Sequence, residues 1–418
     1  MPYVEGRVVH DADSHIMEAP NFLDGYVEER YAEPIRRKHM FSLLGEKSGK
    51  DLFAVIRGRH DDPKWRAEGA EQILLRKNYE ALGSWRREDR PHALDSLGFA
   101  SQLMFTTMFL GLLNLEHEGD PVMRQAVAHG FNRAMVDFCA VDRRLLASCY
   151  VPLADFEEAA SIARDAISIG AKALLIPSRC PKGHSPSHIG FDPVWAQAQE
   201  AGLPILFHVG GGGPLLSKDY FVNGLPPVPD FHGGDGNFRS VDYMAIPFPP
   251  MQTLSTMIFD RVLDRFPRLK FGVIEQGASW LPGWMRSMDS AHNAFIKNED
   301  RLKKLSMRPS EFVQRQVRVT PYPAEDTGWI IANSGDGICM FSSDFPHVEG
   351  GRNPIKRFEE TMRATPEPAK RRFYCDNFVD LMGNGIAPEL RAPRIGNLVC
   401  SNSALISSAE GERNSAPR

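Results

Sequence analysis

The stretch ICMFSSDFPH, residues 338–347, holds the pattern that decides the fold. Its first four residues form an apolar run, which is typical of a buried strand. Asp344 follows this run and precedes the turn that Pro346 imposes. Proteins that alternate strands and helices place their sites at the carboxyl ends of parallel strands. The stretch therefore predicts a functional carboxylate at a strand end, with a cap of the following helix as the simpler interpretation.

Seven further apolar runs precede this one and alternate with helical patterns. The runs are residues 7–13, 101–107, 145–151, 171–177, 204–209, 270–275 and 316–320. The helical patterns are residues 91–98, 121–141, 155–169, 192–201, 251–265, 280–295 and 327–333. Eight strands interleaved with helices predict an α/β fold, a (β/α)8 TIM barrel. A doubly wound open sheet is the alternative, but no GxGxxG or GxxxxGK[ST] motif follows the first strand to support its nucleotide-binding form.

The length of 418 residues suits one barrel that carries insertions. We expect a single domain over residues 1–391, with a C-terminal helical extension. Residues 16–90 are highly charged and lack strand periodicity, so they predict a long insertion that covers the barrel as a lid or builds a subunit interface. The polar stretch 392–418 predicts a flexible tail or an arm on a neighbouring subunit.

The composition limits the class of partner. The chain is 42% hydrophobic and 24% charged with a net charge of -4, which gives no support for binding nucleic acid or an anionic membrane. No run approaches the roughly 20 apolar residues of a membrane span, and acidic residues stand where a signal peptide needs its apolar region. The six cysteines show no CxxC spacing. We therefore expect reduced thiols, a cytoplasmic protein, a small-molecule substrate and a homo-oligomer, namely a dimer.

Ionisable residues gather at the carboxyl ends of the predicted strands. They are Asp13, His15, His208, Glu275, Asp344 and His347. In a closed barrel these positions converge on one face, whatever their separation along the chain. Nitrogen and oxygen ligands together favour zinc, manganese or iron over calcium or magnesium. The pattern therefore predicts a divalent metal site, with zinc as the first choice.

Each residue also has a purely structural explanation. His208 lies between two apolar residues and fits a core histidine bonded to the backbone, while Asp13 and His15 fit a capping pair. Glu275 is harder to explain in this way, because an unpaired buried carboxylate costs several kcal/mol or shifts its pKa. The joint occurrence at four strand ends favours a site.

Four motifs resemble the amidohydrolase-related branch of metal-dependent hydrolases, the group that contains aminocarboxymuconate-semialdehyde decarboxylase and the resorcylate-type decarboxylases. They are DADSH at residues 11–15, LFHVG at 206–210, FPRLKF at 266–271 and SSDFPH at 342–347. The resemblance covers residues 8–381. It implies that Asp13, His15 and His208 bind a metal. It also implies that Asp344 binds the metal or its water and handles protons.

Two features depart from that family. Glu275 begins the sequence EQG where the decarboxylases carry a histidine in an HxG context, tied to proton delivery. A carboxylate there suits a metal ligand or a general base, and so favours hydrolysis. The charged segment 16–90 is also longer than in the compact decarboxylases.

The sequence thus favours a metal-dependent hydrolase that acts on a small aromatic or unsaturated carbonyl or carboxylate substrate. Asp344 would orient and deprotonate water, Glu275 would be a ligand or a second acid/base, and His347 would contact the substrate or cap a helix. A non-oxidative decarboxylase of an aromatic or muconate-like acid is the alternative, followed by a non-catalytic ligand-binding barrel. Aromatic and imidazole side chains in the Gly/Pro-rich segment 210–250 predict a hydrophobic or aromatic substrate. They are Phe221, Phe231, His232, Phe238 and Tyr243.

Overall fold

The computed structural model describes residues 1–37, 46–111, 120–210, 215–226 and 240–391. Seven parallel strands form one sheet and neighbour one another in chain order. They are β1 (His10–His15), β2 (Ser101–Phe105), β3 (Leu145–Tyr150), β4 (Ala173–Leu175), β5 (Ile205–His208), β6 (Phe271–Ile274) and β7 (Val317–Val319). Every residue of these strands is buried, as expected for a parallel sheet covered on both faces. The predicted first strand, residues 7–13, actually begins and ends later.

Residues 338–345 join the two edges of the sheet. Met340 N–H donates to Val319 O of β7 at 2.9 Å, and Ala12 N–H of β1 donates to Phe341 O at 3.0 Å. The pairing on each side is limited to an isolated bridge, so this segment is less regular than the predicted eighth strand. It nevertheless carries the chain from β7 back to β1. The α/β barrel predicted from the alternating pattern is confirmed.

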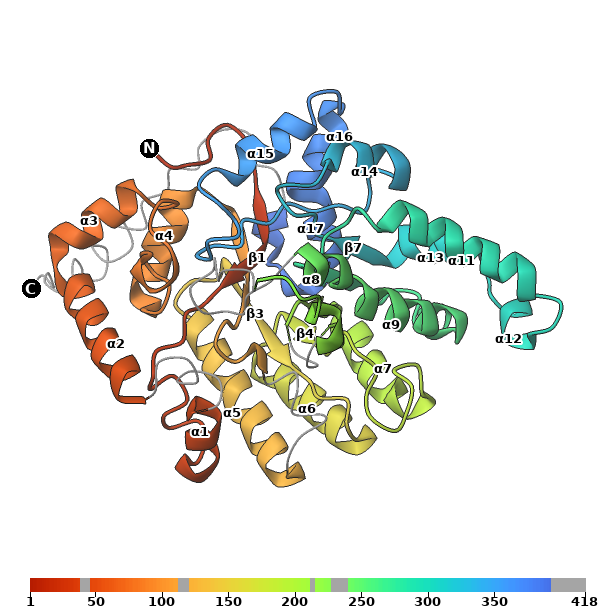
Figure 1. Ribbon diagram of the computed structural model, residues 1–418, viewed down its shortest axis with the longest axis horizontal. Helices are drawn as coiled ribbons and strands as arrows, with labels where there is room; N and C mark the ends of the chain where they lie inside the picture. Colours follow the sequence, from red (N-terminus) through yellow and green to blue (C-terminus); the bar gives the residue numbers. More distant parts are fainter. Residues whose placement is uncertain (38–45, 112–119, 211–214, 227–239, 392–418) are drawn as a thin grey trace, which may run out of the picture.

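Helices follow the strands around the outside of the barrel. They are α5 (Pro121–Cys139), α6 (Phe156–Ile169), α7 (Asp192–Ala201), α9 (Phe248–Phe259), α10 (Val262–Arg265), α11 (Leu281–Phe295), α13 (Pro309–Gln316) and α14 (Thr327–Ser334). Figure 1 shows α5, α6, α7 and α9 in succession along one side of the strands. The predicted helix 251–265 is two helices, because Arg261 adopts a left-handed φ of 68° between them.

Local sequence explains where such a helix begins and ends. Asp155 accepts hydrogen bonds from the N–H groups of Glu157 and Glu158 and so caps the first turn of α6. Gly170 ends the helix with a φ of 107°, which a residue with a Cβ rarely adopts.

The segment predicted as an insertion contains the helices α1 (Glu29–Ile35), α2 (Glu46–Asp61) and α3 (Pro63–Glu71), and α4 (Arg90–Leu97) follows it. Figure 1 shows α2 and α3 on the opposite side of the molecule from α11. The end of the segment is fixed to the barrel, since the buried Arg90 guanidinium donates to His15 O at 2.9 Å. Asn78 N–H donates to Pro346 O at 2.9 Å. The segment therefore contacts both β1 and the loop that follows Asp344.

Helices α15 (Pro354–Thr361), α16 (Glu367–Arg371), α17 (Asn377–Met382) and α18 (Pro388–Arg391) complete the described chain. Phe378 of α17 stacks on His10 at 5.1 Å between ring centroids, so this extension packs against β1. The predicted tail, residues 392–418, lies outside the described residues, as do Phe231, His232 and Phe238. None of the described helices is long and apolar enough to cross a membrane. The five described cysteines are all free thiols.

Candidate metal centre

Four of the predicted site residues form one cluster at the strand ends. Asp13, His15, His208 and Glu275 each offer a ligand atom, and these atoms all lie within 4.8 Å of one another. His208 Nε2 is 3.4 Å from Asp13 Oδ1 and 3.4 Å from Glu275 Oε2. His15 Nε2 is 3.1 Å from Asp13 Oδ1. Because β1, β5 and the end of β6 supply these groups, only closure of the sheet brings them together.

The remaining two predicted residues form a second group that shares His15 with the first. Asp344 and His347 lie with His15 within the same 4.8 Å limit. His15 Nε2 is 3.7 Å from Asp344 Oδ1. His347 Nδ1 donates to the same Asp344 oxygen at 2.8 Å. The structure thus brings all six predicted residues to one face of the barrel.

The backbone fixes which nitrogen of two imidazoles points into the cluster. His15 Nδ1 donates to Thr106 O at 2.8 Å, and His208 Nδ1 donates to Val209 O at 2.8 Å. A carbonyl oxygen can only accept, so both Nδ1 atoms carry hydrogen, and Nε2 is the nitrogen of each ring that faces the carboxylates. Lone pairs facing carboxylate oxygens repel each other. A cation between them removes that repulsion, which is the usual orientation of a metal-binding histidine.

Buried polar atoms without partners point to the same conclusion. Asp13 Oδ2, Asp344 Oδ2 and His15 Nε2 are buried and make no hydrogen bond among the described residues. Burial and then the nearby His347 lower the pKa of His15 to about 4, so His15 is neutral at pH 7, as a ligand must be. Burial alone would raise the pKa of Asp13, but its interactions with His15 and His208 lower it below the usual range. The donor set fits a divalent metal ion.

The two acidic residues beyond the strand ends have unusual backbone conformations. Glu275 and Asp344 each have a φ of 52°, in the left-handed region that non-glycine residues rarely occupy. Such outliers are costly and cluster at functional sites. Glu275 is held by Tyr322, whose hydroxyl donates to its carbonyl oxygen at 2.6 Å. Asp344 N–H donates to Asp13 O at 2.9 Å, which aligns the two carboxylates.

The capping interpretations of Asp344 and His347 are wrong. The next helix, α15, begins at Pro354, and Asn353 is its cap. The interpretation of His208 as a core histidine bonded to the backbone is correct for Nδ1 only. Its Nε2 faces carboxylates instead.

Several residues that contact the site or its supporting segments were not predicted from the sequence. Asp11 accepts from Ser343 N–H at 2.7 Å, from Ser343 Oγ at 2.6 Å and from Gln102 Nε2 at 3.0 Å. It thereby ties β1 to the segment before Asp344, and burial raises its pKa to about 7. Glu18 and Lys77 were missed as well, because the segment 16–90 carries no strand periodicity that would place them near the site. Thr107 was missed although it ends the predicted strand 101–107, because it is not an ionisable residue.

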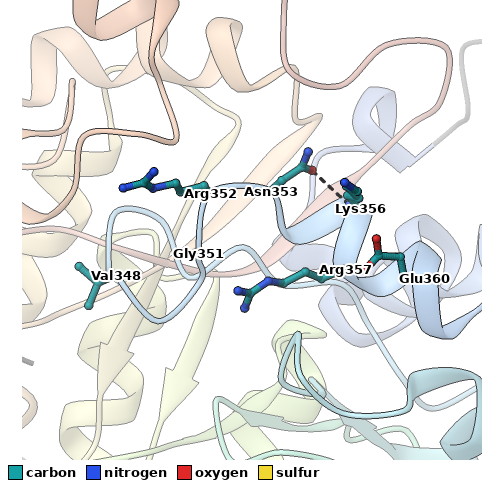
Figure 2. A pocket seen from close by; sticks show the side chains of 7 residues that line it. All are labelled: Val348, Gly351, Arg352, Asn353, Lys356, Arg357 and Glu360. Atoms are coloured by element: carbon teal, nitrogen blue, oxygen red, sulfur yellow. Dashed lines mark hydrogen bonds between the residues drawn. The ribbon is translucent and has the colours of Figure 1, made fainter. Parts of the chain in front are cut away.

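A pocket of about 490 Å³ lies on the loop after Asp344 rather than in the cluster itself. Its lining residues are Val348, Gly351, Arg352, Asn353, Lys356, Arg357 and Glu360. Figure 2 shows Arg357 reaching from α15 back towards Gly351. Lys77 approaches the same loop from the insertion, and its Nζ donates to Gly351 O at 2.6 Å. Burial lowers the pKa of Lys77 to about 8, while the charge of Asp344 acts in the opposite direction.

The segment between β5 and α9 approaches the cluster at Glu275, through Tyr322. Tyr243 of α8 (Ser240–Ala245) lies against Tyr322, with 5.3 Å between ring centroids. Tyr322 in turn bonds Glu275. An aromatic surface therefore adjoins the carboxylate that departs from the decarboxylase pattern.

Comparisons with known proteins agree with this geometry. Residues 79–379 match the model of the amidohydrolase family, more than half of the chain, although the matched range begins after β1. A comparison with curated proteins gives no match.

Solved structures share the fold. An amidohydrolase from Mycobacterium avium subsp. paratuberculosis is similar over 91% of this chain and 100% of its own, with 22% identity and a TM-score of 0.69. A 5-carboxyvanillate decarboxylase from Novosphingobium aromaticivorans, solved with manganese, covers 90% and 96%, with 20% identity and a TM-score of 0.59. A 2,6-dihydroxybenzoate decarboxylase from Rhizobium covers 91% and 99%, with 15% identity and a TM-score of 0.57. From the family match and the cluster at its strand ends, the chain belongs to the amidohydrolase family.

Proposed function

We propose that this protein is a metal-dependent hydrolase acting on a small, uncharged carbonyl substrate with an aromatic or unsaturated part. The observation that carries the proposal is the third carboxylate at the site. Glu275 Oε2 lies 3.4 Å from His208 Nε2 and joins Asp13 in the ligand cluster, while Asp344 stands at its edge. Three carboxylates around a divalent ion leave a net negative charge.

That charge discriminates between substrates. A substrate carboxylate brought to such a centre is repelled, because like charges at a buried site interact strongly. A neutral carbonyl group is not repelled. The replacement of a histidine by Glu275 thus favours hydrolysis of a neutral ester, amide or lactone over loss of carbon dioxide from an acid.

Asp13, His15, His208 and Glu275 would hold the metal, with Asp344 beside His15. A bound divalent ion would supply a Lewis acid and a source of hydroxide at neutral pH. The nitrogen and oxygen donors favour zinc, with manganese or iron as the alternatives. The backbone acceptors of His15 and His208 keep both rings in the orientation that a cation requires.

Asp344 is the general base in this proposal. Its Oδ1 is occupied by His347 Nδ1, so Oδ2 is the oxygen left to take a proton from the attacking water. Water adds its oxygen to the carbonyl carbon, the bond to the leaving group breaks, and Asp344 returns the proton to that group. His347 donates to Asp344 throughout and holds its carboxylate in place.

A metal-dependent decarboxylase is the second candidate. It is favoured by three cations near the loop after Asp344, namely Arg352 of the loop, Arg357 of α15 and Lys77 of the insertion, which would attract an acidic substrate. Two of the similar solved structures are decarboxylases of aromatic acids. That likeness concerns the fold and leaves the reaction to be decided by the site.

A substrate panel separates the two candidates. The zinc- and manganese-loaded protein is offered aryl esters, amides and lactones, and in parallel hydroxybenzoates and muconate-like acids. Hydrolysis of an ester or lactone releases an acid that a pH indicator follows, and hydrolysis of an amide releases an amine that is assayed directly. Decarboxylation releases carbon dioxide into the headspace. We expect turnover of neutral substrates only. Carbon dioxide release without hydrolysis would replace the first candidate with the second.

A further inference from the structure

A buried carboxylate outside the ligand cluster contacts the turn that orients two of the site's imidazoles. Glu18 is 1% exposed and lies three residues after His15. Its carboxylate accepts from Met108 N–H at 2.9 Å, from Thr107 N–H at 3.2 Å and from the Thr106 hydroxyl. All of these partners belong to the turn that follows β2.

The same turn contacts both imidazoles directly. Thr106 O accepts from His15 Nδ1 at 2.8 Å. Thr107 Oγ1 lies 2.8 Å from His347 Nε2. His347 Nδ1 already donates to Asp344, so in the neutral form of the ring Nε2 accepts from the Thr107 hydroxyl. Thr106 and Thr107 therefore set the orientation of a ligand histidine and of the histidine that holds the general base.

A hydrogen bond from the insertion also holds the backbone of Glu18. The Tyr79 hydroxyl, from the insertion, donates to Glu18 O at 2.8 Å. The position of the carboxylate is thus fixed by the insertion on one side and by the turn after β2 on the other. Four hydrogen-bond contacts join this one carboxylate to the Thr106 hydroxyl and to the Thr107 and Met108 N–H groups, so they satisfy the buried carboxylate and hold the turn together.

We propose that Glu18 is a positioning residue for the metal centre: it holds the Thr106–Thr107–Met108 turn, and the turn fixes the Nδ1–H tautomer of His15 and the orientation of His347. This inference rests on the metal site proposed above. It assigns the insertion a part in building the centre, because Glu18 and its anchor Tyr79 both lie in that segment.

The test compares Glu18→Gln with a matched control. The substitution keeps the size of the side chain but presents an amide NH2 group to the N–H donors of the turn. Glu158→Gln removes the charge of another buried glutamate, which pairs with Arg124 at 2.7 Å between α5 and α6 and does not belong to the ligand cluster. Zn²⁺ affinity is measured by competition of each apoprotein with a chelating dye. We expect Glu18→Gln to bind Zn²⁺ about 10–100-fold more weakly and Glu158→Gln to match the wild type.

A second readout needs no metal. The tautomer of His15 is read from the ¹⁵N shifts of labelled histidines in the apoprotein, with the His15 signal assigned by its loss in His15→Gln. We expect pure Nδ1–H in the wild type and a mixture in Glu18→Gln. Wild-type affinity and a pure tautomer in Glu18→Gln would overturn the proposal, even if that variant were less stable.

Two further outcomes are decisive. If Glu18→Gln does not fold, Thr106→Val removes the hydroxyl that donates to Glu18 and accepts from Phe109 N–H, and it keeps the carbonyl that accepts from His15. A smaller loss of Zn²⁺ affinity in the same direction supports the proposal, and none contradicts it. If the wild type binds no Zn²⁺, the metal site fails, whereas the tautomer measurement still decides the role of Glu18.

Discussion

His347 Nδ1 donates a 2.8 Å hydrogen bond to Asp344 Oδ1. The other oxygen, Oδ2, is buried and has no hydrogen-bond partner among the described residues. One oxygen is thus fixed and the other is available. A carboxylate with one oxygen held by a hydrogen bond can accept a proton on the other oxygen without changing its position. This is the property expected of a general base.

Asp344→Asn removes the basic oxygen but preserves the shape of the side chain. We expect kcat to fall by about 10²–10⁴-fold, the usual contribution of a positioned acid or base. Circular dichroism should match the wild type, and elemental analysis should find most of the metal retained. Near-normal kcat in a folded variant would return Asp344 to a structural role.

Removal of the metal should abolish turnover. Dialysis against a chelator leaves Nε2 of His15 and Nε2 of His208 facing carboxylates with no cation between them. We expect activity to return on addition of Zn²⁺ or Mn²⁺, titrated against the measured metal content. Full activity in a sample that elemental analysis shows to be metal-free would exclude the mechanism.

Glu275→Gln removes one of the three carboxylate charges. We expect Zn²⁺ affinity to fall by about tenfold or more, since a ligand group is lost while His208 and Asp13 remain. The reduced negative charge should also let aromatic acids inhibit hydrolysis at lower concentration. Dye competition and inhibition constants measure the two effects, with Glu158→Gln as the control for loss of a buried glutamate. Unchanged values for both would remove Glu275 from the centre.

Lys77→Met tests the role of the cations near the loop after Asp344, which Lys77 contacts from the insertion. If acidic molecules approach the centre along this loop, their KM or inhibition constant should rise by about tenfold or more, the loss expected when a charged hydrogen bond of ~1.5–3 kcal/mol is removed. Neutral substrates should be unaffected. Equal effects on both classes would show that Lys77 acts only through its bond to Gly351.

His10 makes the stability of the barrel depend on pH. Burial lowers its pKa from 6.5 to about 4, so the unfolded chain binds the proton at a higher pH than the folded one. The stabilisation is therefore fully present above pH 6.5 and is lost as the pH falls towards 4. The shift corresponds to on the order of 3 kcal/mol.

In His10→Asn, which retains a polar group towards Ser101, the free energy of unfolding in denaturant should fall less between pH 7 and pH 4 than in the wild type. Parallel pH profiles for the two proteins would contradict this.

The sequence by itself determined the order of the strands and helices. It also determined which ionisable residues follow the strands. Alternating apolar runs and helical patterns are local properties, so they predicted the barrel. Burial of those runs then placed Asp13, His208 and Glu275 at one face. The weakest strand prediction was the eighth, because residues 338–345 depend on β1 and β7 for their pairing and form only isolated bridges. The predicted dimer and the single-domain boundary stay predictions.

The tertiary structure alone decided how the site residues are oriented. The tautomers of His15 and His208 follow from the backbone carbonyls that the fold places beside them. The turn at Thr106 and Thr107 meets His15 and His347 only after β1, β2 and the segment before His347 have come together. Glu18 and Lys77 lie in a segment without periodicity, so their contacts with residues about 90 and 270 positions away had no sequence signal. Side-chain orientation at a closed barrel arises from contacts between distant segments, and only the folded chain contains them.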